Sequence, residues 1–110
     1  IEDIIVANSY SEINVSMPSV VELGDAYPNP FNPTTVINYD MQNDGHTLIE
    51  IRGVGGNYIR TLINNYVQMG SKSITWDANN DHGEKVPAGI YFYTLKTNNY
   101  IQTQKMVLLK

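Results

Sequence analysis

Short runs of alternating apolar and polar residues, separated by turn-forming residues, fill most of this 110-residue chain. A period of two residues is that of a β-strand with one buried face. The clearest run is 34–41, in which one face collects Thr35, Ile37, Tyr39 and Met41. No window shows the i, i+3, i+4, i+7 spacing of an amphipathic helix. The pattern therefore predicts a chain built of strands.

Other stretches of the same character complete the set of predicted strands. They are 46–54, 58–63, 71–78, 90–97 and 100–110, with 13–17 and 20–23 as weaker candidates. "NDG" at 43–45 predicts a hairpin turn and "GGN" at 55–57 a second one, which makes a three-stranded meander. The stretch 90–97 is almost wholly apolar or aromatic, so we expect it to be covered on both faces.

About seven strands at spacings of roughly 8–14 residues predict an all-β fold, an immunoglobulin-like antiparallel β-sandwich. The chain has no cysteine, so it lacks the Cys…Trp…Cys pattern of antibody domains and the likeness is architectural. Trp76 and the tyrosines are the expected core anchors, because aromatic side chains bury the most area per residue.

One segment fits neither strand nor helix. "YPNPFNP" at 27–33 consists of Tyr27, Pro28, Asn29, Pro30, Phe31, Asn32 and Pro33. Proline fixes φ and biases the preceding residue toward extended backbone, which predicts an extended, polyproline-like start to the domain. Asn29 and Asn32 are expected to bond nearby backbone groups, and Tyr27 and Phe31 to plug an open end of the sandwich. A proline-rich ligand for an aromatic groove is the alternative.

Charge and composition exclude several classes of function. A net charge of −4 and a pI near 4.9 argue against binding to nucleic acid or to anionic membranes. The absence of cysteine excludes disulfides, thiolate catalysis and Cys-type zinc sites. No apolar run approaches about 18 residues, so no membrane span is predicted. The chain starts at Ile1 without a signal peptide, and we expect it to be a domain of a longer protein.

The loop 77–88 is the one candidate for a metal site. Its oxygen-bearing side chains are Asp77, Asn79, Asp81 and Glu84. Such ligands suit calcium, but Gly83 comes one place late for an EF-hand loop and Ala88 holds the twelfth position. We therefore expect a solvated turn in which Asp77 caps backbone amides, and no metal.

No catalytic constellation is evident. His46 and His82 lie in different predicted turns and are expected to be plain surface residues, and "GVGG" at 53–56 is too short for a phosphate loop.

Four blocks in a fixed order carry a resemblance to a known family. They are "YPNPFNPTTVINYDM", "GGNYIRTL", "ITWDANNDHGEKVPAGIYFYTLK" and "TQKMVLLK". Together they resemble the C-terminal sorting domain, type A, of type IX secretion cargo, which overlaps the FlgD-like immunoglobulin-like module. The resemblance covers 24–110. Beside the proline segment, its structural motif includes Trp76, Asp77, Gly89 and Tyr91.

The resemblance implies a seven-stranded sandwich at the end of a larger exported protein. It implies recognition by an outer-membrane translocon, removal by a sortase-like peptidase and attachment of the N-terminal passenger at the cell surface. It implies no catalytic residue and no cofactor. Residues 1–23 do not match and are expected to be a linker or an additional N-terminal edge strand.

The resemblance places the export signal in the last strand, at Lys105, Met106, Val107, Leu108, Leu109 and Lys110. Met106 and Leu108 fall on one face and Val107 and Leu109 on the other. Either both faces are covered within the domain or one face is left for a partner. Flanking lysines typically protect an edge strand from aggregation. An edge strand can also be recognised by a partner that adds a strand to it.

A different class of function stays open beside sorting: a glycan-binding or structural sandwich module of an extracellular enzyme. Exposed aromatic side chains of β-sandwiches commonly bind sugars, and the candidates are Tyr58, Tyr66 and Tyr100.

Overall fold

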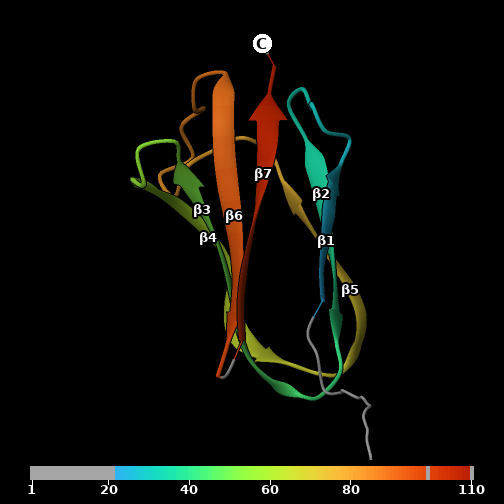
Figure 1. Cartoon of the computed structure of the whole chain (residues 1–110). Coiled ribbons are helices and arrows are strands. Elements are labelled where there is room, and N and C mark those ends of the chain that lie inside the picture. The colour runs from blue at the N-terminus through green and yellow to red at the C-terminus, as the bar shows by residue number, and fades with distance from the viewer. Residues whose placement is uncertain (1–21, 99, 110) are drawn as a thin grey trace, which may run out of the picture.

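The computed structural model describes residues 22–98 and 100–109, and within these residues seven strands and no helix are found (Figure 1). The strands are β1 (Glu22–Tyr27), β2 (Thr35–Met41), β3 (Gly45–Gly53), β4 (Tyr58–Val67), β5 (Gly70–Trp76), β6 (Gly89–Thr97) and β7 (Tyr100–Leu108). In this part of the chain no helix is long and apolar enough to cross a membrane.

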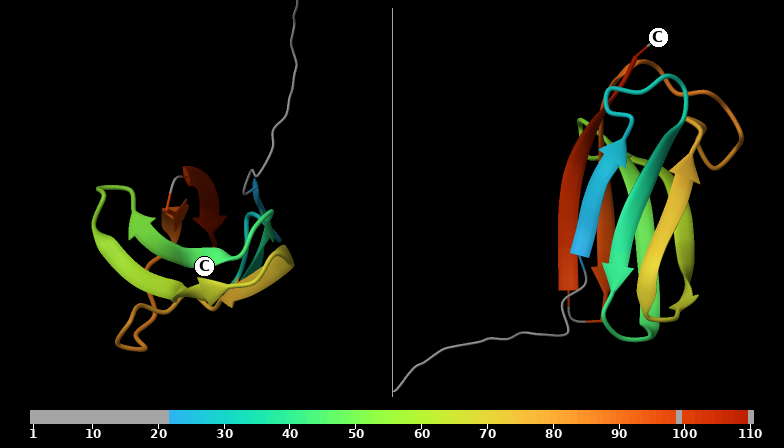
Figure 2. Two further views of the ribbon diagram at one scale, coloured as in Figure 1. Left: turned by 90° about the horizontal axis from the view of Figure 1, so that it is seen from below. Right: turned by 90° about the vertical axis from the view of Figure 1, so that its right-hand side faces the viewer.

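The strands form two antiparallel sheets that face each other, and the predicted sandwich is confirmed. One sheet has the order β1-β2-β5 and the other the order β4-β3-β6-β7. Figures 1 and 2 show the two sheets as separate layers, with β1 and β7 adjacent along one long side. Along that side no loop joins the two neighbouring strands.

The core lies between the sheets, on the faces that the two-residue alternation predicted. The predicted inner face of β2 is buried along its whole length, as are Ile49 and Ile51 of β3. Trp76 is fully buried, with its ring centroid 5.7 Å from that of Phe31 and 5.3 Å from that of Tyr91. Such tilted and edge-on pairs suit the aromatic quadrupoles and add to the burial of area.

The predicted meander is wrong at its first turn. β2 and β3 belong to different sheets, since Met41 pairs with Gly70 and Gly45 pairs with Val67. Residues 42–44 therefore cross from one sheet to the other. Alternation marks the buried face of a strand but does not say which strand pairs with it. The second predicted turn is confirmed, because β3 and β4 are joined by a hairpin in which Gly56 has a φ of 86°.

The expectation that 90–97 is covered on both faces is also wrong. Tyr91, Tyr93 and Leu95 of β6 are buried, whereas Ile90 and Phe92 on the other face are partly exposed. The outward face of this sheet has no second layer over it among the described residues. Its apolar side chains therefore form a surface patch.

At the N-terminal end of the described residues, β1 is an edge strand of its sheet. The weak candidate 20–23 overlaps β1, which starts at Glu22 and runs across the expected boundary between 23 and 24. The candidate 13–17 lies outside the described residues.

The proline segment is bent, not polyproline-like. Bends occupy 28–30 and 32–33, and the peptide bonds before its three prolines are cis. Phe31 plugs the sandwich as predicted, with 1% of its surface exposed. Tyr27 does not, since 76% of its surface is exposed. The reason is strand alternation: Tyr27 ends β1 directly after the buried Ala26, so its side chain points to solvent.

Candidate docking surface at the C-terminal strand

The C-terminal strand β7 is an edge strand that pairs within its sheet only with β6. Alternation divides its end into two sets of side chains. Met106 and Leu108 are buried in the core, with 0% and 5% of their surface exposed. The side chains that reach the surface are Lys105, Val107 and Leu109. Lys110 lies outside the described residues. Of the five predicted docking residues that the structure describes, the folded domain therefore offers three to a partner.

The outer backbone edge of β7 is already occupied near its end. The Phe31 N–H donates to the Val107 carbonyl at 2.9 Å, and the Leu109 N–H donates to the Phe31 carbonyl at 2.8 Å. Asn29 adds two bonds: its Oδ1 accepts from the Val107 N–H at 2.9 Å, and its Nδ2 donates to the Lys105 carbonyl at 3.3 Å. The side chain of Asn29 and the backbone of Phe31 thus make the hydrogen bonds that an added strand would make at this edge.

Asn29 bonds backbone groups, but the expectation that these groups are nearby is wrong, because Lys105 and Val107 lie 76 and 78 positions away in the chain. No local sequence pattern reports a contact of that separation.

Two glutamines of β7 bridge the sheets further along the same side. Gln104 Nε2 donates to the Leu23 carbonyl at 2.7 Å, and the Leu23 N–H donates to Gln102 Oε1 at 3.3 Å. Both backbone groups of one β1 residue are therefore satisfied by side chains from the opposite sheet.

A buried tyrosine completes this contact between the sheets. The Tyr93 hydroxyl accepts from the Ala26 N–H at 2.8 Å and donates to the Gly24 carbonyl at 2.9 Å. Burial raises the pKa of Tyr93, since the ionised phenolate is disfavoured away from water. The sequence marked Tyr93 only as part of an aromatic strand.

The remaining motif residues fix the loop between β5 and β6. Trp76 Nε1 donates to the Asn79 carbonyl at 2.9 Å, and the Tyr91 hydroxyl donates to the Pro87 carbonyl at 2.5 Å. Gly89 begins β6 with a φ of 151°, a conformation that side-chain-bearing residues rarely adopt. These residues hold both ends of the loop against the core, which is a structural role.

Asp77 and Glu84 of that loop each bond different partners. Asp77 accepts from the Asn79 N–H at 3.2 Å, which confirms the predicted cap, and pairs with Arg60 at 3.1 Å. Glu84 accepts from Asn80 Nδ2 at 3.0 Å. Within the described part of the chain no group of three His, Cys, Asp or Glu side chains could hold a metal ion. Nothing here favours the calcium interpretation.

Asp81 ties the tip of the loop to β4. Its carboxylate accepts from the Tyr58 hydroxyl and from the Thr61 N–H, the latter at 3.3 Å. The hydrogen bond from Tyr58 is the main reason why the pKa of Asp81 lies below its usual range. Partial desolvation, then the bond to Asp81, raise the pKa of Tyr58. His46 and His82 are exposed, as predicted.

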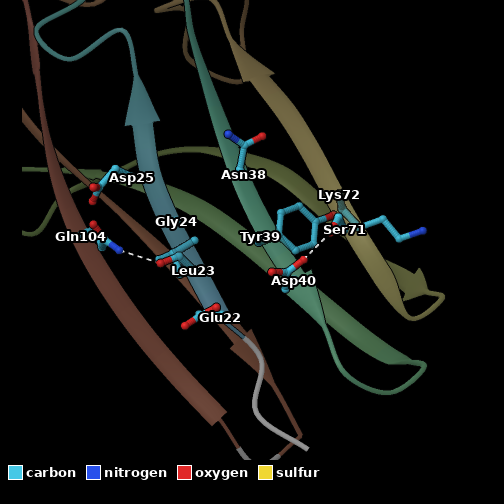
Figure 3. Close-up of a pocket in the computed structure, with 10 residues that line it drawn as sticks. All are labelled: Glu22, Leu23, Gly24, Asp25, Asn38, Tyr39, Asp40, Ser71, Lys72 and Gln104. Carbon is cyan, nitrogen blue, oxygen red and sulfur yellow. Dashed lines mark hydrogen bonds between the residues drawn. The ribbon is translucent and has the colours of Figure 1, made fainter.

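A cavity lies across β1, β2 and β5, with Gln104 at its side (Figure 3). Its volume is about 470 Å³, and its lining is mainly polar. The close-up shows Ser71 bonded to Asp40, at 2.6 Å, and Gln104 bonded to the backbone of Leu23. The Ser71 hydroxyl thus donates to a carboxylate, and no histidine is among the described residues that line this cavity.

The tyrosine candidates for glycan binding do not form a platform. Tyr58 and Tyr66 are exposed as predicted, but they stand at opposite ends of β4, about 25 Å apart at the rise of a strand. Tyr100 is partly buried and its hydroxyl bonds Gln102 Oε1 at 2.7 Å.

Structural comparison finds relatives of low sequence identity, which show the fold alone. Latent dimeric PorU of Porphyromonas gingivalis aligns over 90% of this chain and 10% of its own, with 19% identity and a TM-score of 0.70. PorZ of the same organism, a surface component of the type IX secretion system, aligns over 82% and 11%, with 18% identity and a TM-score of 0.52. FlgD of Xanthomonas campestris aligns over 80% and 64%, with 18% identity and a TM-score of 0.56. The chain spans about a tenth of PorU and of PorZ.

Comparison with curated protein sequences gives no significant match. The model of one protein family, the secretion system C-terminal sorting domain, matches residues 25–109. That range covers most of the chain and agrees with the resemblance of the sequence to type IX sorting domains. The chain therefore belongs to the family of secretion system C-terminal sorting domains, which label an exported protein for its secretion system.

Proposed function

We propose that this domain directs an N-terminal passenger protein to an outer-membrane type IX translocon, and that it does so by docking rather than by catalysis. The family match over residues 25–109 carries this proposal. Two features support a docking role. The end of β7 lies at a sheet edge, and several polar groups of the loop between β5 and β6 are engaged in holding the loop.

We propose a second step after export. Once the fusion has passed through the outer membrane, a sortase-like peptidase removes the domain and the passenger is attached at the cell surface. The passenger is secreted or surface-bound, and the sandwich itself needs no cofactor.

A reporter fusion tests the sorting function directly. The whole chain is fused behind a fluorescent protein and expressed in a bacterium with a type IX system, and in the same strain without its translocon. We expect reporter accessible to external protease only in the first strain. Equal surface delivery in both strains, or none in either, contradicts the proposal. A fusion to an unrelated β-sandwich of similar size is the matched control.

The mass of the delivered reporter tests the peptidase. Removal of the domain predicts a product smaller than the intact fusion by nearly the mass of this chain, 12.4 kDa. Delivered reporter that keeps its full mass contradicts cleavage but leaves sorting intact.

A further inference from the structure

We propose that the partner docks on the outward face of the β6–β7 pair at its C-terminal end, through side chains, and that it presents an apolar surface flanked by carboxylates. We call this face, formed by Ile90, Phe92, Lys105, Val107 and Leu109, the terminal patch. The inference rests on the proposed function, since it assumes that β7 is the part of the domain that is recognised.

The occupied edge of β7 argues against recognition by strand addition. An added strand must bond the Lys105 and Val107 carbonyls and the Val107 and Leu109 N–H groups, all four of which are bonded to residues 29 and 31. To free the Val107 carbonyl and the Leu109 N–H, Phe31 has to leave a fully buried site against Trp76. Opening the edge thus opens the core, whereas the outward side chains are accessible in the closed domain.

The register of the two strands brings the terminal patch together. Ile90 stands opposite Val107, and Phe92 stands opposite Lys105. Ile90 and Leu109 expose 41% and 49% of their surface, and Val107 and Phe92 are half-buried. Exposed apolar side chains gathered on one face, beside a charged one, are typical of interaction sites in soluble proteins.

A hollow adjoins the patch at Ile90. It has a volume of about 240 Å³ and is bordered by Val54, Ile59, Pro87 and Ala88 as well as by Ile90. An exposed apolar patch beside a small hollow suits a partner that inserts an apolar side chain next to its contact with the patch.

The charge of this face is opposite to that of the chain. The charged side chain of the terminal patch is Lys105, and Glu50 of β3, an acid on the same outward face, is paired with Arg52 at 3.0 Å. The outward side chains at the start of the other sheet are acidic instead: they are Glu22, Asp25 and Asp40. A partner with carboxylates is therefore attracted to the terminal patch. It is repelled from the acidic outward face of the other sheet, and the chain as a whole has a net charge of −4.

The two ends of the same strand pair supply matched variants. Lys105→Glu with Leu109→Ser changes the terminal patch. Lys96→Glu with Ile101→Ser makes the same kind of change at the other end, where Lys96 stands opposite Ile101 and both are exposed. All four positions are on the surface, so both double variants should melt like the parent.

Both variants are tested as reporter fusions of the full chain in the strain with the type IX system. We expect surface delivery to fall about tenfold or more for the first and to stay within about twofold of the parent for the second. Equal delivery by the two variants overturns the proposal. If the parent delivers reporter in this comparison, the sorting function stands whatever the variants do; if the parent does not, both proposals fall.

Asn29→Ala separates face docking from strand addition. This change removes both side-chain bonds to the edge of β7 and leaves the terminal patch in place. Face docking predicts that delivery does not rise above the parent level. Higher delivery by Asn29→Ala shows that the partner recognises the free backbone edge of β7, and overturns the proposal.

Discussion

The two long sides of the sandwich are closed in different ways. On one side the chain crosses from β4 in one sheet to β5 in the other through Gln68 and Met69 (Figure 2). Where β1 faces β7 no connection crosses, and side chains close the gap by bonding backbone groups of the opposite sheet. The first side is held by covalent continuity, whereas the second depends on individual residues.

This difference explains the chemistry along the β1–β7 side. Both strands there lie at the edges of their sheets, and an unpaired edge is a template for association with other chains. Asn29, Phe31, Tyr93 and the glutamines of β7 satisfy much of that edge within the domain. The side that carries β7 is therefore the one most sensitive to single substitutions.

Trp76→Ala should have the largest effect, because Trp76 ends β5 and also supports Phe31, which covers β7. Loss of a fully buried tryptophan costs about 3–5 kcal/mol of the free energy of unfolding, comparable to the whole stability of a small domain. Urea denaturation followed by circular dichroism measures it. An unchanged midpoint means that Trp76 does not anchor the core.

Tyr93→Phe should be next. It keeps the ring but leaves the buried Ala26 N–H and Gly24 carbonyl without their partner, which costs about 1–3 kcal/mol. The same denaturation experiment applies, with Tyr66→Phe on the exposed side of β4 as the control. Equal effects of the two changes contradict the special role of the β1–β7 side.

Stability should also fall at alkaline pH through Tyr93. Its folded pKa lies above the ordinary tyrosine value of 10.0 because the hydroxyl is buried. The contribution is therefore complete below the unfolded pKa of about 10 and is lost as the pH rises through the folded value. Melting temperatures between neutral pH and a pH of about 11 should drop less steeply for Tyr93→Phe than for the parent. Parallel curves argue against this coupling.

Arg60→Met should have the smallest effect. Arg60 and Asp77 form an ion pair at 3.1 Å on the other side of the sandwich, and both side chains are at least one third exposed. Solvent screening limits such a pair to about 0–1 kcal/mol. A loss as large as that of Tyr93→Phe shows that the β4–β5 side also depends on single contacts.

The sequence predicted the features that depend on local pattern. Alternation identified the buried face of β2 and the opposite faces of Met106 and Val107, and aromatic character identified the burial of Trp76. Local pattern could not assign β2 and β3 to different sheets, because pairing is decided by distant partners such as Thr35 with Trp76.

The candidate site shows the same limit. The resemblance drew attention to both the proline segment and the last strand, but nothing local indicates that one bonds the other. The expectation that Tyr27 plugs the sandwich failed for a related reason. The direction of its side chain depends on its position in β1, which the local sequence did not define.

Hydrogen exchange of single backbone amides tests most directly the claim that residues 29 and 31 occupy the edge of β7. The Val107 and Leu109 amides should be protected, because they donate to Asn29 and Phe31. By the alternation of the ladder the Thr103 amide points to the same side, and no acceptor for it is found among the described residues, so it should exchange faster. In Asn29→Ala, Val107 should lose protection and Leu109 should keep it. Exchange of Val107 in the parent as fast as that of Thr103 would contradict the account.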